Sequence, residues 1–252
     1  MPERIALVTG GLGGVGQSTV ARLSREGWRV VVTTRGQQDT LPGRDTTDAD
    51  KIVIADVSTP EGALLAVQEC SRYYGQPPGG LVNCAGSVVV SPLHHTSEST
   101  YRQCLQANLD TAFFSLQAFT SACMEANVPG AAVLVSSVAA RIGIVNHEAI
   151  AAAKAALEGL TRSAAATYSR KRIRINAVAP GMMRTSATES FFKMPDADRH
   201  LSAQYPLGRT GDVADVAHAA SWLLSDEASW ITGQVLPVDG GFTAVRPIQK
   251  ST

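Results

Sequence analysis

The stretch Arg4–Leu23, RIALVTGGLGGVGQSTVARL, decides the fold class. A short β-rich apolar run leads into a cluster of glycines, and apolar residues at helical spacing follow. The cluster fits two spacings, G-x-G-x-x-G on Gly11, Gly13 and Gly16, or G-x-x-x-G-x-G on Gly10, Gly14 and Gly16 after Thr9. Either one lets the backbone approach a pyrophosphate at the helix N-terminus. The stretch therefore predicts a dinucleotide-binding loop between a strand and a helix.

The rest of the chain continues this alternation of strands and helices. Apolar, β-rich runs occur at residues 28–34, 51–56, 79–86, 131–137, 173–180 and 233–241. Helical patterns lie between them, the longest at residues 101–126 and 148–168. Strands that are apolar on both faces are typical of a parallel sheet covered by helices on each side. We therefore expect one Rossmann-like, doubly wound α/β domain over residues 1–252, with about seven strands.

Composition excludes several function classes. Lys plus Arg and Asp plus Glu number 22 each, so the chain has no electrostatic footprint for nucleic acid or an acidic membrane surface. The four cysteines form no CxxC pair, and we expect neither a metal site nor a disulfide framework. Because a strand is predicted to begin by Ile5, we expect no signal peptide, and no apolar run approaches the ~18 residues of a membrane span. We expect a cytoplasmic protein that binds a small molecule.

The end of the second strand bears on cofactor choice. A dinucleotide fold that prefers NAD usually places an acid there for the ribose hydroxyls. This chain has Thr34 followed by Arg35. A neutral hydroxyl and a guanidinium favour a 2′-phosphate, whereas an acid would repel it. The pattern therefore predicts NADP(H) as the preferred cofactor, with NAD(H) as an alternative; Arg35 as a plain surface arginine is the competing interpretation.

Along nearly its whole length, the chain resembles the short-chain dehydrogenase/reductase family. The motifs that carry the resemblance occur in the family's order: Thr9-Gly10…Gly14…Gly16, Asp56 in ADV, NCAG at Asn83–Gly86, PGMMRT at Pro180–Thr185 and the closing GQVLPVDGG. The resemblance implies that the cofactor contacts are Thr9, Gly10, Gly14, Val15, Gly16, Thr34, Arg35, Asp56, Val57, Asn83, Ala85, Gly86, Lys154, Pro180, Gly181 and Thr185.

The same resemblance implies an active-site tetrad with one member missing. Asn108 in QANL matches the asparagine that maintains a water and proton path, and Ser137 matches the serine that hydrogen-bonds the substrate oxygen. Lys154 matches the lysine that holds the nicotinamide ribose and lowers the pKa of a tyrosine. That tyrosine should stand thirteen residues after the serine and four before the lysine, and both counts fall on Ile150.

The missing hydroxyl has a physical meaning. Residues i and i+4 share a helix face, so a phenol at position 150 would stand beside the ammonium of Lys154, which would bring the phenol pKa toward the working pH. Isoleucine offers neither a proton nor an acceptor. Shifting the register by one residue gives Ala149 or Ala151, and Tyr168 lies about five turns down the helix.

Three hypotheses account for Ile150. The protein is an oxidoreductase with another proton source, either a water relayed from Lys154 or the side chain of His147. Alternatively, it binds the cofactor without catalysis, as a redox sensor or scaffold. In the third, the substrate is an activated double bond or an imine that needs no tyrosine acid. Retention of Ser137 and Asn108 favours an enzyme, because a pure cofactor binder has little use for the serine.

The substrate and partner signals are weaker. Residues 186–206 occupy the position of the family's mobile lid, and we expect Phe191, Phe192 and Met194 to line an apolar substrate pocket if it folds down. The helix at residues 148–168 carries small residues, among them Ala152 and Ala156, that permit close helix approach. Relatives commonly pair this helix across a two-fold axis, so the resemblance implies a homodimer or homotetramer.

Overall fold

Strand β1, Ile5–Thr9, is buried along its whole length in the middle of a seven-stranded sheet. The computed structural model describes residues 3–36, 47–193 and 195–246. The strand order is β3-β2-β1-β4-β5-β6-β7, and every neighbouring pair is parallel. The other strands are β2 (Arg29–Thr34), β3 (Lys51–Ile54), β4 (Gly80–Asn83), β5 (Gly130–Val135), β6 (Ile173–Pro180) and β7 (Val235–Val238). This sheet confirms the predicted fold class.

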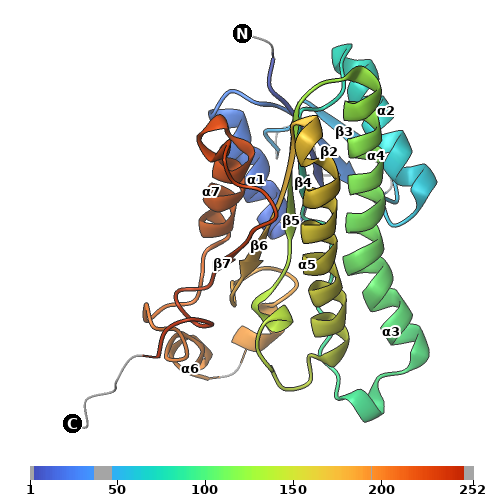
Figure 1. The fold of residues 1–252 in the computed structure, drawn as a ribbon. Coiled ribbons are helices and arrows are strands. Elements are labelled where there is room, and N and C mark those ends of the chain that lie inside the picture. Colours follow the sequence, from blue (N-terminus) through green and yellow to red (C-terminus); the bar gives the residue numbers. More distant parts are fainter. Residues whose placement is uncertain (1–2, 37–46, 194, 247–252) are drawn as a thin grey trace.

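Helices cover both faces of the sheet (Figure 1). One face carries α1 (Gly14–Arg25) and α7 (Val213–Leu224), and the other carries α2 (Pro60–Tyr74), α4 (Thr111–Ala126) and α5 (Glu148–Tyr168). The central strands β1 and β5 are apolar on both faces because each face is buried under helices. Among the described residues, no helix combines the length and apolar character that a membrane crossing requires.

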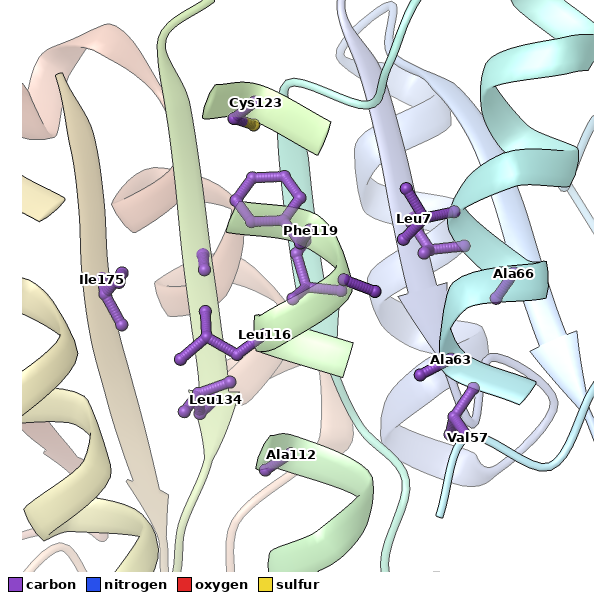
Figure 2. Close-up of a cluster of buried hydrophobic side chains, with 14 of the residues drawn as sticks. Leu7, Val57, Ala63, Ala66, Ala112, Leu116, Phe119, Cys123, Leu134 and Ile175 are labelled. Atoms are coloured by element: carbon purple, nitrogen blue, oxygen red, sulfur yellow. The ribbon is translucent and has the colours of Figure 1, made fainter. Parts of the chain in front are cut away.

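Helix α4 packs Phe119, the largest of the fully buried side chains, onto the sheet (Figure 2). Leu116 lies one turn before it, next to Leu134 of β5. A Cβ added at Gly130, the first residue of β5, would lie 2.9 Å from the ring atom Cζ of Phe119. Glycine at that position therefore leaves the space that the ring fills, and this packing fixes α4 and β5 relative to each other.

The order in which strands are added to the sheet reverses at the boundary between the neighbouring strands β1 and β4. Strands β2 and β3 extend to one side of β1, and β4 to β7 extend to the other. The carboxyl ends of β1 and β4 are joined: the Thr9 hydroxyl donates to Asn83 Oδ1, and the Cys84 N–H donates to the Thr9 carbonyl at 3.0 Å. A crevice at such a reversal point is where open α/β sheets bind ligands.

The predicted helix over residues 101–126 is interrupted. Helix α3 (Glu98–Leu105) leads into a π-helical turn, Gln106–Asp110, and α4 follows directly. Asn108 is fully buried in this turn, and its Nδ2 donates to the Cys104 carbonyl at 3.0 Å. A side chain that bonds the carbonyl four residues back competes with the regular helical ladder. The interruption turns the Asn108 amide toward the edge where the strands end.

Candidate functional site

Two glycines, one in the loop between β1 and α1 and one in the first turn of α1, have no room for a side chain. Gly10 has a φ of +64°, and a Cβ there would lie 2.7 Å from the Ala85 backbone nitrogen. At Gly16 a Cβ would lie 2.2 Å from the Gly10 carbonyl oxygen. The first turn of α1 therefore packs directly onto the loop, and the loop packs directly onto the segment after β4.

The two predicted glycine spacings differ in how well they match these contacts. Gly13 has only an ordinary contact, with the nearest atom 3.4 Å from an added Cβ, although Gly11 lies against the Val32 side chain at 2.5 Å. Gly14 has less space for a side chain than Gly13, because a Cβ at Gly14 would lie 3.1 Å from Cγ2 of Thr185. The spacing through Gly10, Gly14 and Gly16 is therefore the one in which every glycine is held in a tight contact.

The N-terminus of α1 is suited to an anion. Its N-cap residue, Gly13, supplies no side-chain cap, and the first turn contains no acidic residue. The first N–H groups of a helix lack intrahelical partners and carry the positive end of the helix dipole. This helix end is therefore suited to bind a dinucleotide pyrophosphate, because it is exposed, has no competing carboxylate and is preceded by glycines.

The ends of β2 and β3 place the predicted specificity residues near each other. The Thr34 hydroxyl accepts a hydrogen bond from the Gly36 N–H at 3.2 Å, and Arg35 is exposed. The Ser58 hydroxyl, 2.7 Å from Asp56 Oδ1, lowers the pKa of the Asp56 carboxyl, and the charge of Arg35 adds to this effect. A cation and an anion thus flank this edge, while Val57 is buried beside them.

The segment after β4 brings the loop, the π turn and α5 together. A Cβ added at Gly86 would lie 2.8 Å from Asn108 Oδ1 and 3.5 Å from Lys154 Nζ. Asn108 Oδ1 also accepts the Ser87 N–H at 3.2 Å. Glycine at position 86 therefore allows the buried Asn108 amide of the π turn and the buried Lys154 amine of α5 to approach one backbone segment.

A cavity of about 680 Å³ lies at these strand ends. Of the predicted residues, it is lined by Gly14, Val15, Gly16, Gly86, Asn108, Ser137, His147, Ile150, Lys154, Pro180, Gly181 and Thr185. The remaining lining is mainly apolar and includes Val88, Val138, Ile144, Met182, Phe191 and Leu201. The structure therefore brings the predicted loop, the predicted tetrad positions and part of the predicted lid around one space.

Lys154 and Ile150 occupy the same face of α5, as the i, i+4 spacing predicts. Lys154 is only 6% exposed, and its Nζ donates to the Val135 carbonyl at 2.7 Å. Burial lowers the pKa of Lys154 to about 8. Ile150 is 5% exposed and packs into a small apolar cluster with Cys104, Ala149 and Ala153. The environment of position 150 is therefore apolar except for the neighbouring amine.

Ser137 follows the end of β5, and its hydroxyl donates to no acceptor among the described residues. Its Oγ accepts the Ala139 N–H at 3.2 Å, which occupies a lone pair and leaves the hydroxyl hydrogen available. Because Ser137 lines the cavity, that hydrogen can be directed at a ligand oxygen. The adjacent Ser136 differs, since its hydroxyl donates to the buried carboxylate of Glu158 at 3.1 Å.

His147 is the N-cap residue of α5 and lines the cavity. Its Nδ1 lies 2.7 Å from the Val145 carbonyl oxygen. A carbonyl only accepts, so Nδ1 carries the hydrogen, and Nε2 is the atom that can exchange a proton with a ligand. Tyr168, at the far end of α5, packs against the main hydrophobic core and does not line the cavity.

Tyr205 is a cavity residue that the sequence did not reveal. Its ring packs on Phe242 with centroids 4.8 Å apart, and its hydroxyl accepts the Met182 N–H at 2.7 Å. A Cβ at Gly181 would lie 2.9 Å from ring atom Cε1 of Tyr205, so the glycine lets the ring reach this strand end. Tyr205 follows α6 (Ala197–Ser202) with no motif of its own, and only its position within the expected lid could have suggested it.

The remaining predicted cofactor residues lie outside the cavity lining. Thr9, Gly10, Asn83 and Ala85 form the strand-end scaffold behind it. A second group, at the ends of β2 and β3, lies apart from the cavity and comprises Thr34, Arg35, Asp56 and Val57. Of the three residues expected to form an apolar lid, Phe191 lines the cavity and Phe192 is buried without lining it, whereas Met194 lies outside the described residues.

Comparison with known proteins places this arrangement among oxidoreductases. The family model described as enoyl-(acyl carrier protein) reductase matches residues 10–243. The A-factor type gamma-butyrolactone 1'-reductase (1S-forming) of Streptomyces virginiae is 32% identical over 96% of each chain. The cis-4-hydroxycyclohexanecarboxylate dehydrogenase of Sinomonas cyclohexanicum is 33% identical, over 96% of this chain and 98% of its own length.

Among solved structures, ElxO with NADP bound superposes with a TM-score of 0.88 at 25% sequence identity. The match covers 96% of this chain and all of that one. The agreement in fold therefore extends over nearly the whole chain.

Proposed function

This chain belongs to the short-chain dehydrogenase/reductase family, and we propose that it is an NADP(H)-dependent oxidoreductase that uses a non-standard proton donor. Its substrate is a carbonyl compound or a similar small apolar molecule. The observation that carries the proposal is the shared cavity, in which Ser137 and Lys154 are retained beside an isoleucine. The mainly apolar lining favours an uncharged substrate.

The roles of the side chains follow from their hydrogen bonds. A bound nicotinamide supplies or accepts the hydride. The free hydrogen of the Ser137 hydroxyl polarises the substrate oxygen, because the serine oxygen already accepts the Ala139 N–H. Lys154, held by the Val135 carbonyl, would hold the ribose hydroxyls of a bound cofactor, and Asn108 fixes the backbone beside it. None of these contacts depends on a tyrosine at position 150.

The proton must come from another group. Two routes are compatible with the cavity: a water relayed from the Lys154 ammonium, or Nε2 of a protonated His147, whose Nδ1 is held by the Val145 carbonyl. A substrate with a conjugated double bond needs no proton donor from the protein, since solvent can protonate the carbanion that hydride addition produces. The enoyl reductase description of the matching family model supports including this substrate class.

The cofactor preference rests on the edge formed by β2 and β3. Arg35 is exposed, and Asp56 is occupied by hydrogen bonds from the Ser58 hydroxyl and N–H. Thr34 places no negative charge at the end of β2. A 2′-phosphate would therefore meet a guanidinium rather than an acid, and we propose NADP(H) over NAD(H).

We expect Arg35→Ala to weaken NADPH binding by about tenfold and to leave NADH binding unchanged, because one charge-assisted hydrogen bond to the phosphate is lost. Isothermal titration of both nucleotides measures this directly. Arg102→Ala, on the exposed face of α3, is the matched control for loss of a surface charge. Equal weakening of both nucleotides would assign Arg35 a general role and contradict the proposed preference.

The surroundings of the cavity support two further parts of the proposal. Residues 186–206 supply Phe191, Leu201, Gln204 and Tyr205 to its wall, as a substrate lid would. On α5, Ala152 and Ala156 are exposed, so this helix presents a flat surface of small side chains. We propose a homodimer or homotetramer formed through this face.

The competing function is that of a cofactor-bound sensor or scaffold, which the apolar side chain at position 150 favours. A substrate screen separates the two. We expect NADPH oxidation with at least one class among ketones, imines and conjugated alkenes, measured spectrophotometrically. If NADPH binds at micromolar concentration while all three classes are inert, the sensor function replaces the proposed one.

A further inference from the structure

Within the described residues, the amine of Lys154 has no counter-charge. In the described part of the chain, its hydrogen-bond partner is the Val135 carbonyl, and no carboxylate lies within 4.0 Å of Nζ. The side chain is more than nine-tenths buried, yet it lines the cavity together with Gly86 and Val135, the residues that flank its nitrogen.

The groups that face this amine are neutral near pH 7. Cys84, after β4, and Cys104, on α3, are the titratable groups whose charges act on Lys154. Burial raises the pKa of the Cys84 thiol to about 12 and also raises that of Cys104. Ile150 supplies only hydrocarbon one turn before the lysine. The ammonium form is therefore poorly solvated and has no anion to stabilise it.

Burial lowers the pKa of Lys154 to about 8. About one-tenth of the side chains then carry a free lone pair at pH 7, against about one in 2,500 for an ordinary lysine with a pKa of about 10.4. An unprotonated amine in an apolar, ligand-sized cavity is the arrangement that makes a lysine nucleophilic toward carbonyl groups.

We propose that Lys154 forms a reversible imine with small, uncharged aldehydes that enter the cavity. The Nζ lone pair adds to the carbonyl carbon, and one proton passes from the nitrogen to the oxygen to give a carbinolamine. The hydroxyl then leaves with the remaining N–H proton as one water, which gives the C=N bond. No electrons are transferred overall. The inference rests on the proposed function only in treating this cavity as the place where a carbonyl ligand binds.

The chain suits a direct test because it contains five lysines: Lys51, Lys154, Lys171, Lys193 and Lys250. The full-length protein without nucleotide is incubated with benzaldehyde and sodium cyanoborohydride, which reduces an imine to a stable secondary amine. Peptide mass spectrometry then gives the occupancy at each lysine. We expect labelling at Lys154 at least about tenfold above that at Lys51, which Glu69 holds at 2.7 Å, and at the exposed Lys171.

The pH dependence provides an independent readout. Because the pKa of Lys154 is lowered, its labelling should rise steeply between pH 6 and about 8 and then level off. Labelling of exposed lysines should still be rising above that pH. Lys154→Arg keeps the positive charge but cannot form an imine, so the label at position 154 should vanish while the other sites keep theirs.

Labelling at Lys154 that is no higher than at Lys171, in protein with a wild-type circular dichroism spectrum, overturns the proposal. A parallel NADPH titration by thermal shift tests the proposed function separately. Labelling without NADPH binding would leave the imine intact and reject the oxidoreductase. NADPH binding without labelling of Lys154 would reject the imine and leave the proposed oxidoreductase function intact. Saturating NADPH should also suppress labelling, because Lys154 then contacts the ribose.

Discussion

Ile150→Tyr should raise the kcat/KM for ketone reduction by NADPH about 10²–10⁴-fold, the contribution that general acid catalysis typically makes. The phenol would stand one helical turn before Lys154 on the buried face of α5. A retained ammonium would lower the pKa of the phenol and align its proton with the substrate oxygen. Position 150 lines the cavity, so the larger ring can extend into open space.

Ile150→Phe is the matched control, because it adds the ring without the hydroxyl. In both variants the new ring is too large for the apolar cluster with Cys104, Ala149 and Ala153. Any loss of stability from repacking this cluster is therefore common to both. Steady-state kinetics on the best substrate of the wild type, together with a pH profile, separates the hydroxyl from the ring. Equal rates for the two variants would mean that Ser137 and Lys154 are not arranged to use a phenol.

The sheet and helix α5 were predictable because their signals are local and repeated. The central strands β1 and β5 are apolar on both faces, and the pattern over residues 148–168 coincides with α5. The π-helical turn at Asn108 was not predictable, since it depends on one amide bonding the Cys104 carbonyl rather than on periodicity. Over residues 101–126, a continuous helix and one interrupted by a π turn would show almost the same spacing of apolar residues, so the sequence pattern does not distinguish them.

The site was predictable to the extent that its motifs follow strands. Ser137, Ile150 and Lys154 line one cavity, as their spacing implies. Tyr205 was missed because its place depends on the chain after α6 folding back onto Gly181. The sequence also left two glycine spacings open, and the choice depends on Thr185, which meets Gly14 from more than 170 positions away in the chain.

Gly16→Ala should weaken NADPH binding about 100-fold. A Cβ at this position would lie 2.2 Å from the Gly10 carbonyl oxygen and 2.8 Å from the Gly11 Cα, both of which belong to the backbone. The loop must therefore move away from the first turn of α1. Losing two charge-assisted hydrogen bonds between loop amides and the pyrophosphate removes about 3 kcal/mol, and each 1.4 kcal/mol is about tenfold in affinity. The same overpacking should lower the free energy of unfolding by about 1–3 kcal/mol.

Gly13→Ala tests whether this effect comes from the specific contact or from any substitution in the loop. Its φ of −78° is ordinary for alanine, and the nearest atom to the new Cβ is 3.4 Å away. We therefore expect less than about a threefold change in NADPH affinity, measured by isothermal titration, and a urea midpoint close to wild type. If Gly13→Ala weakened binding as strongly as Gly16→Ala, the spacing through Gly11, Gly13 and Gly16 would describe the loop. The close approach of α1 to Gly10 would then not be what shapes the phosphate site.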